Sequence, residues 1–112
     1  MALLTVQNIA RSAITPTYAA VSASDTFTPG QYTFVHIKNA GGSPDTVTVI
    51  VAQGDPPGLT ITDVSISVTN GQERMIGPFP PFFFADPVTG LATITNSFTT
   101  SVTIAVLNLT QP

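Results

Sequence analysis

The chain has 112 residues, of which only 8% are charged, and its formal net charge at pH 7 is -3. Soluble proteins carry about 25% charged residues on average, so much of this surface must consist of neutral polar and apolar groups. Three basic residues, none adjacent to another, give no positive stripe for a phosphate backbone, which argues against nucleic-acid binding. Because the sequence contains no cysteine, disulfides and thiolate metal sites are excluded.

The N-terminal residues, MALLTVQNIAR, contain four apolar residues before Thr5 interrupts the run, which is too short for a secretory signal. No stretch approaches the ~18 apolar residues that a membrane span requires. We therefore expect a protein made in the cytoplasm, with no membrane partner. Residues 10–24, which include Pro16, show weak patterning and predict an irregular N-terminal arm over residues 1–24. In this interpretation the first strand lies away from the main sheet.

The rest of the chain alternates between apolar and polar residues with a period of two, which is typical of half-buried strands. Threonine, valine and isoleucine supply 18, 11 and 9 residues, and their branched side chains favour strands over helices. No window shows a convincing helical period. We predict strands at Leu3–Ile9, Tyr32–Lys38, Thr46–Val51, Val64–Val68, Glu73–Ile76, Leu91–Asn96 and Val102–Leu109.

Residues that favour turns separate these strands. Asn70-Gly71 predicts a type I′ hairpin between Val64–Val68 and Glu73–Ile76, because these two residues readily adopt positive φ. Residues 39–44 and 53–58 are rich in glycine and proline and predict loops. Seven or eight short strands with such connections predict one all-β domain over residues 1–112, built as an antiparallel β-sandwich or a jelly roll.

His36 is the single histidine of the sequence and lies within a predicted strand. It shares one face of that strand with Phe34 and Lys38, while Val35 and Ile37 take the other face. No strained nucleophile turn such as G-x-S-x-G accompanies it, so a Ser-His-Asp site is not indicated. We interpret His36 as a structural or surface-facing residue.

Acidic residues give an equally weak signal for a metal site. Asp45, Asp55 and Asp63 are the candidates for calcium, but they are eight or more residues apart and match no EF-hand spacing. Glu73 is the single glutamate, and with Arg74 it predicts a solvated hairpin end rather than a catalytic pair. We therefore expect no enzymatic activity, no cofactor and no bound metal.

The segment Gly77–Pro87, GPFPPFFFADP, holds four phenylalanines and four prolines in eleven residues. Burial of one phenylalanine contributes ~1.5–3 kcal/mol, so a small domain cannot leave all four in water. Two interpretations remain open. Either the rings plug the open end of the sandwich, or the prolines hold a stiff extended segment whose outward rings pack against a neighbouring subunit. The candidate subunit or capsid contact residues are Arg74, Met75, Pro78, Phe79, Pro80, Phe82, Phe83 and Phe84.

Two stretches, Thr33–Gly42 (TFVHIKNAGG) and Gly71–Pro80 (GQERMIGPFP), together with Gln7–Ile9 and Thr15–Tyr18, resemble small head proteins of tailed double-stranded DNA bacteriophages. The resemblance implies a capsid decoration, or cement, protein that binds the major capsid protein outside the expanded shell and stabilises it through subunit contacts. It also implies a homo-oligomer, with a trimer favoured, on the outer capsid surface of the virion after synthesis in the bacterial host cytoplasm.

Two alternative functions remain beside this resemblance. One is a structural component of the tail or of the head-tail junction. The other is a carbohydrate-binding β-sandwich on the virion surface, for which Tyr18, Tyr32 and Phe79 are the candidate residues that stack on sugars.

Overall fold

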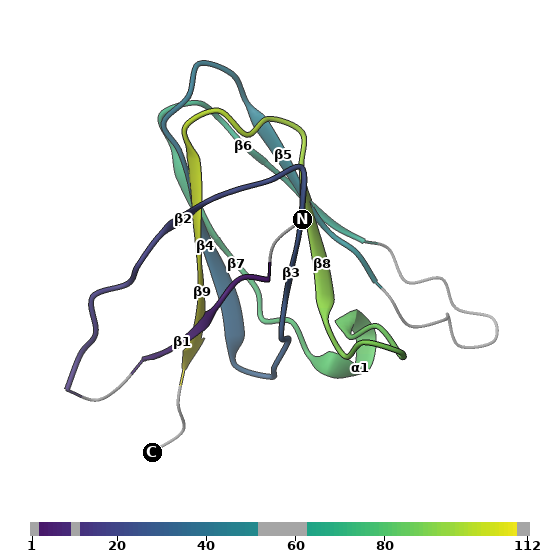
Figure 1. The fold of residues 1–112 in the computed structure, drawn as a ribbon. Helices are drawn as coiled ribbons and strands as arrows, with labels where there is room; N and C mark the ends of the chain where they lie inside the picture. The colour runs from purple at the N-terminus through teal and green to yellow at the C-terminus, as the bar shows by residue number, and fades with distance from the viewer. Residues whose placement is uncertain (1–2, 10–11, 52–62, 110–112) are drawn as a thin grey trace.

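The computed structural model describes residues 3–9, 12–51 and 63–109 of the chain. Short strands dominate them, as the β-branched composition predicts, and one helical turn is present (Figure 1). The elements are β1 (Val6–Ile9), β2 (Ala19–Ala20), β3 (Ser24–Phe27), β4 (Thr33–Asn39), β5 (Asp45–Val49), β6 (Val64–Val68), β7 (Glu73–Ile76), α1 (Pro81–Phe84), β8 (Ala92–Asn96) and β9 (Val102–Leu109).

The strands form two sheets. The five-stranded sheet has the order β1-β9-β4-β7, with β2 also paired to β9, and the four-stranded sheet has the order β3-β8-β5-β6. The β1–β9 pair is parallel, and the other strand pairs among the described residues are antiparallel. The prediction of an all-β, mainly antiparallel sandwich is confirmed.

From β2 onward the strand pairing is nested. β2 pairs with β9, β3 with β8, β4 with β7 and β5 with β6, each time antiparallel. This is the pairing of one long hairpin, and its successive strand pairs alternate between the two sheets. The β4–β9 pair joins β2 and β9 to β4 and β7 in the five-stranded sheet. The β5–β8 pair joins β3 and β8 to β5 and β6 in the four-stranded sheet. Of the two predicted architectures, the strand order is therefore that of a jelly roll, with β1 added at one edge.

The core lies between the two sheets and is built from alternate residues of each strand. Val35 and Ile37 of β4 and Val49 of β5 are fully buried, whereas Thr46 and Lys38 face outward. β4 and β5 thus bury these aliphatic side chains and turn Lys38 and Thr46 toward the surface, whereas Asp45 of β5 and Asp25 of β3 are buried polar exceptions. The predicted division of β4 into two faces is confirmed.

The N-terminal residues differ from the prediction. β1 runs beside β9, from Val6 opposite Val106 to Ile9 opposite Leu109, and β2 pairs with the same strand. Leu4 is buried in the core. The first strand therefore belongs to the main sheet, because it pairs with the last strand of the chain. Within the described part of the chain, the irregular arm is confined to residues 12–18 and to short links beside the strands. Residues 1–2 and 10–11 of the predicted arm and the predicted loop 53–58 lie outside the described residues.

The connection between β6 and β7 is a turn but not a hairpin, because the two strands belong to different sheets. The amide of Gln72 donates to the carbonyl of Thr69 at 3.0 Å and closes a four-residue turn. Gly71 has a φ of 80°, but Asn70 is not among the residues with positive φ. A type I′ turn requires positive φ at both positions, so the predicted type is wrong. Each strand pairs instead with a partner distant in sequence.

Candidate functional site

The segment Gly77–Pro87 leaves β7 and returns to the start of β4. Gly77 has a φ of 150°, and a Cβ there would lie 2.6 Å from the Cβ of Phe34, so this position requires glycine. The amide of Phe79 then donates to the carbonyl of Thr33 at 3.0 Å. These two constraints direct the ring of Phe79 into the sandwich.

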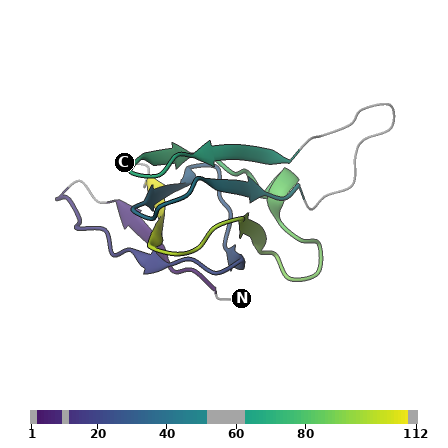
Figure 2. The same cartoon turned by 90° about the horizontal axis from the view of Figure 1, so that it is seen from above.

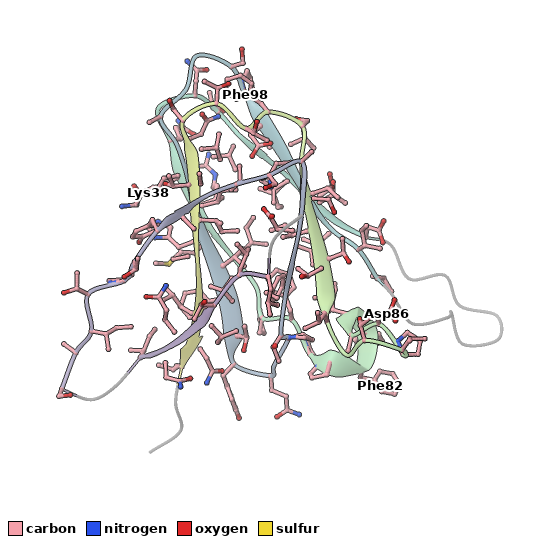
Figure 3. The ribbon with its side chains drawn as sticks, in the orientation of Figure 1. Lys38, Phe82, Asp86 and Phe98 are labelled. Atoms are coloured by element: carbon pink, nitrogen blue, oxygen red, sulfur yellow. The ribbon has the colours of Figure 1, made fainter. Side chains whose placement is uncertain are left out.

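The segment next forms α1, one helical turn from Pro81 to Phe84, rather than the predicted extended strap. Proline suits the first position of a helix, because its φ is preset and its missing N–H needs no partner there. Consecutive residues of a helix point about 100° apart, so the three phenylalanines face three directions. Phe84 is 8% exposed, Phe83 packs partly against the core, and Phe82 is 73% exposed at the lower end of the molecule (Figure 3).

Phe79 and Phe84 belong to the core. Phe79 is 1% exposed, and its ring meets those of Phe27 and Phe84 edge to face, with centroids 5.6 and 5.2 Å apart. Burial removes both residues from the predicted contact surface, and it removes Phe79 from the candidates for sugar stacking. The plugging interpretation is confirmed for these two rings, whereas a contact role stays a prediction for Phe82.

A second exposed apolar group lies on the outer face of the five-stranded sheet. Tyr32, Met75 and Leu109 are 44%, 66% and 54% exposed and border a shallow hollow of about 290 Å³. Phe34, Pro78 and the buried Ile76 also contribute to its apolar lining. We give the name Met75 surface to Tyr32, Phe34, Met75, Pro78 and Leu109. It brings together two predicted subunit-contact residues, Met75 and Pro78, with the sugar-stacking candidate Tyr32 and with Phe34 and Leu109, for which no contact was predicted.

A signal for the missed residues is present in the sequence of β9. In Ala105-Val106-Leu107 the apolar residues are consecutive, so both faces of the strand are apolar rather than one. Leu107 lies opposite Phe34 in the β4–β9 pair and is buried on the outer side of the sheet. An apolar outer face on a strand indicates a covered or contacting surface.

Two further predicted contact residues, Arg74 and Pro80, do not line the hollow of the Met75 surface. The guanidinium of Arg74 donates to Gln72 Oε1 at 2.6 Å and to the carbonyl of Glu73 at 2.8 Å. Arg74 also borders a second hollow of about 470 Å³, which Val64, Ile66 and Met75 line as well. Pro80 is half-buried at the start of α1.

The outer face of the four-stranded sheet is neutral and carries hydroxyl groups. Each of its four strands contributes two hydroxyl side chains that alternate with core residues, and Thr48 and Ser65 approach one another at 3.4 Å. Hydroxyl groups both donate and accept hydrogen bonds, so this face suits polar contacts that involve no ion pairs. We call it the hydroxyl face; its residues are Ser24, Thr26, Thr46, Thr48, Ser65, Ser67, Thr93 and Thr95.

Two buried oxygen atoms at one end of the four-stranded sheet have no hydrogen-bond partner among the described residues: Asp45 Oδ2 and Asn96 Oδ1. Asp45 is fully buried, and its Oδ1 accepts from the amide of Phe98 at 3.1 Å. Burial raises the pKa of Asp45 above the usual value of 3.8, and backbone hydrogen bonds from Phe98 and Ser97 oppose this only partly. The carboxyl group therefore holds its proton more strongly than an exposed aspartate does.

His36 lies on the outer face of β4, as predicted, but it is only 8% exposed. Tyr18, from the arm of residues 12–18, covers it and contacts Nδ1 through its hydroxyl at 2.7 Å. Nε2 lies 3.0 Å from Glu73 Oε1 of the neighbouring strand β7. Glu73 and Arg74 are both exposed, as a solvated end requires, and the Glu73 carboxylate in addition contacts the histidine.

No group of three or more His, Cys, Asp or Glu side chains within residues 3–9, 12–51 and 63–109 is placed to hold a metal ion. Of the calcium candidates, Asp45 is buried, Asp63 accepts a hydrogen bond from the amide of Val51 at 2.8 Å, and Asp55 lies outside the described residues. No helix in these ranges is both long enough and apolar enough to cross a membrane.

Comparisons with known proteins give no relative. No protein-family model matches the chain, and neither the curated proteins nor the solved structures contain a significant match.

Proposed function

We propose that this chain is a virion structural protein of a tailed bacteriophage, a capsid decoration protein that binds the major capsid protein on the outside of the head. The identity of the partner comes from the sequence resemblance described above. The observation that carries a contact function is the Met75 surface, an exposed apolar group on a protein with very few charges. Apolar patches that remain exposed on a small domain mark sites of association.

The size of the Met75 surface favours attachment through many copies. Tyr32, Met75 and Leu109 are each about half exposed, so covering them contributes about 3 kcal/mol in total. Association costs ~4–15 kcal/mol in lost translational and rotational freedom. The Met75 surface alone therefore cannot hold a single protomer on a shell. An oligomer that engages several lattice sites at once, such as the favoured trimer, overcomes this limit by multiplying the contact.

The low charge supports the same proposal. Burying charged groups against a partner carries a large desolvation free energy, whereas the desolvation free energy of hydroxyl and apolar groups is smaller. The hydroxyl face, which carries no ionisable group, and the apolar Met75 surface both meet this condition. We propose that one of these faces contacts the shell and that the Met75 surface is the one that does so.

The location of the protein in purified phage particles tests the proposal. We expect density for the jelly roll on the outer capsid lattice in images of whole particles, with three-fold clustering of the copies. Density found only in the tail or at the head-tail junction would assign the alternative structural role. Absence from particles together with saturable, structure-specific binding in a glycan screen would assign the carbohydrate-binding alternative.

A matched pair of substitutions tests which face makes the contact. Met75→Asp places a charge on the Met75 surface, and Ser67→Asp places the same charge on the hydroxyl face. Both side chains are exposed, so both variants should fold with a free energy of unfolding within about 0.5 kcal/mol of the wild type. We expect Met75→Asp to lower attachment to undecorated heads at least roughly tenfold, as a cost of 1.4 kcal/mol implies. Equal attachment by the two variants would refute this assignment of the contact face.

A further inference from the structure

Tyr18, His36 and Glu73 form a relay of contacts on the outer face of the five-stranded sheet. The arm of residues 12–18 lies on the side of the molecule away from α1 (Figures 1 and 2). The Tyr18 hydroxyl lies 2.7 Å from His36 Nδ1, and His36 Nε2 lies 3.0 Å from Glu73 Oε1. The three residues come from the arm, β4 and β7. The tertiary structure therefore places a hydroxyl, an imidazole and a carboxylate one after another. This is the order found in sites where a base activates a nucleophile.

One tautomer of the neutral imidazole satisfies both contacts. A carboxylate only accepts hydrogen bonds, so in this tautomer Nε2 of His36 carries the proton and donates a hydrogen bond to Glu73. In the neutral imidazole, Nδ1 is then the basic nitrogen and accepts the hydrogen bond that the Tyr18 hydroxyl donates. Glu73 thus orients the base, and the base faces the phenolic proton.

Lys38 adds a positive charge at the same place. Its Nζ lies 4.0 Å from the centroid of the Tyr18 ring. A cation at this distance from the ring face forms a cation–π contact with Tyr18. Lys38 extends outward from β4 (Figure 3), and β9 contributes the uncharged Ala105 beside His36. The charged and titratable groups at the relay are therefore Lys38, His36, Glu73 and Tyr18 itself.

We propose that Tyr18 is an activated nucleophile and hence a site of covalent modification by small electrophiles that transfer a sulfonyl, acyl or phosphoryl group. In the sulfonyl case the phenol oxygen attacks sulfur, the O–S bond forms as the S–F bond of a sulfonyl fluoride breaks, and fluoride leaves. The phenolic proton passes to His36 Nδ1, and the resulting imidazolium pairs with Glu73. This property is separate from capsid attachment and does not depend on it.

Modification would also change the arm. An esterified oxygen cannot donate a hydrogen bond, so the contact of Tyr18 with His36 is lost. The arm keeps other contacts, among them two hydrogen bonds of 2.8 Å each between the side chain of Gln7 and the backbone of Thr17. We therefore expect modified protein to keep its jelly roll while residues near Tyr18 become more accessible to proteases.

The chain contains its own control, because Tyr32 is the only other tyrosine and is the more exposed of the two. Wild-type protein is treated with a small aryl sulfonyl fluoride at pH 7.5, and the ester at each tyrosine is measured by peptide mass spectrometry over time. General-base catalysis contributes typically 10²–10⁴-fold, so we expect Tyr18 to react at least about tenfold faster than Tyr32 even though the probe fits no pocket. Equal rates, or a faster rate at Tyr32, would overturn the proposal.

The base is tested by His36→Gln and by Glu73→Gln. His36→Gln removes the basic nitrogen, and we expect the Tyr18 rate to fall to that of Tyr32. If this variant does not fold, Glu73→Gln decides, because it removes the exposed carboxylate that orients His36 through Nε2. We expect Glu73→Gln to lower the Tyr18 rate and to leave the Tyr32 rate unchanged. An unchanged Tyr18 rate in folded His36→Gln or in Glu73→Gln would refute the role of His36.

Discussion

The three consecutive phenylalanines of α1 should differ strongly in what they contribute to stability, although the sequence presents them as equivalent. Phe84 is 8% exposed, and its replacement by alanine leaves a cavity beside Phe79, so we expect a loss of about 3–5 kcal/mol. Phe82 is 73% exposed, so its burial contributes only about a quarter of the ~1.5–3 kcal/mol that a fully buried ring contributes to stability. Phe82→Ala should therefore cost about 0.5 kcal/mol, and Phe83→Ala an intermediate amount.

The free energies of unfolding of this series are measured by urea denaturation and the melting temperatures by heating, each followed by circular dichroism. A loss of 3–5 kcal/mol is a large part of the ~5–15 kcal/mol that stabilises a typical domain. Phe84→Ala should lower the melting temperature by roughly 12–20 °C, whereas Phe82→Ala should lower it by roughly 2 °C. The measurement is repeated at two protein concentrations, because a subunit contact at Phe82 would make the apparent stability depend on concentration.

The series has a clear refuting result. If Phe82→Ala costs as much as Phe84→Ala at both concentrations, the helical turn does not separate the rings as described. A cost that is large for Phe82→Ala at high concentration and small at low concentration would instead assign Phe82 to a subunit contact.

Two further predictions concern positions that the fold constrains. Because burial raises the pKa of Asp45 in the folded state, the fold favours its protonated form, and its contribution to stability is greatest below pH 3.8 and declines as pH rises through the raised value. Wild type should therefore lose stability relative to Asp45→Asn as pH rises from 3 to 7 in urea titrations, and a relative gain would contradict the sign. Gly77→Ala should cost at least about 1–3 kcal/mol, because its Cβ meets Phe34 and its φ is 150°. Gly42→Ala, where a Cβ has open space, serves as the control and should change the free energy of unfolding by less than about 0.5 kcal/mol.

Local patterns located most of the strands. Thr46–Val51 and Val64–Val68 alternate so regularly that their inward and outward faces follow from the sequence, and the structure has β5 and β6 there. β3 was missed because Ser24–Phe27 is short and buries Asp25, whose burial no local pattern indicates. β2 has two residues and exists only because β9 lies beside it.

The candidate contact residues were predicted less well. The sequence indicated that an apolar group near Met75 and Phe82 needs a partner, but it did not separate the buried rings of Phe79 and Phe84 from the exposed one. That separation depends on a single helical turn, whose direction is set by the contact of Phe79 with Thr33 and by Gly77. Tyr32 and Leu109 join the Met75 surface only because β4 and β9 are paired.

The sequence by itself determined that the chain forms strands, which faces of most strands are buried, and that its surface is almost free of charge. These properties depend on residue type and on spacing of two, so they are readable locally. The tertiary structure alone decided the nested pairing of the jelly roll, the inclusion of β1 in the main sheet and the relay of Tyr18, His36 and Glu73. Each of these joins residues more than ten positions apart, and hydrogen bonding across such distances is set by which strands pair rather than by any local pattern.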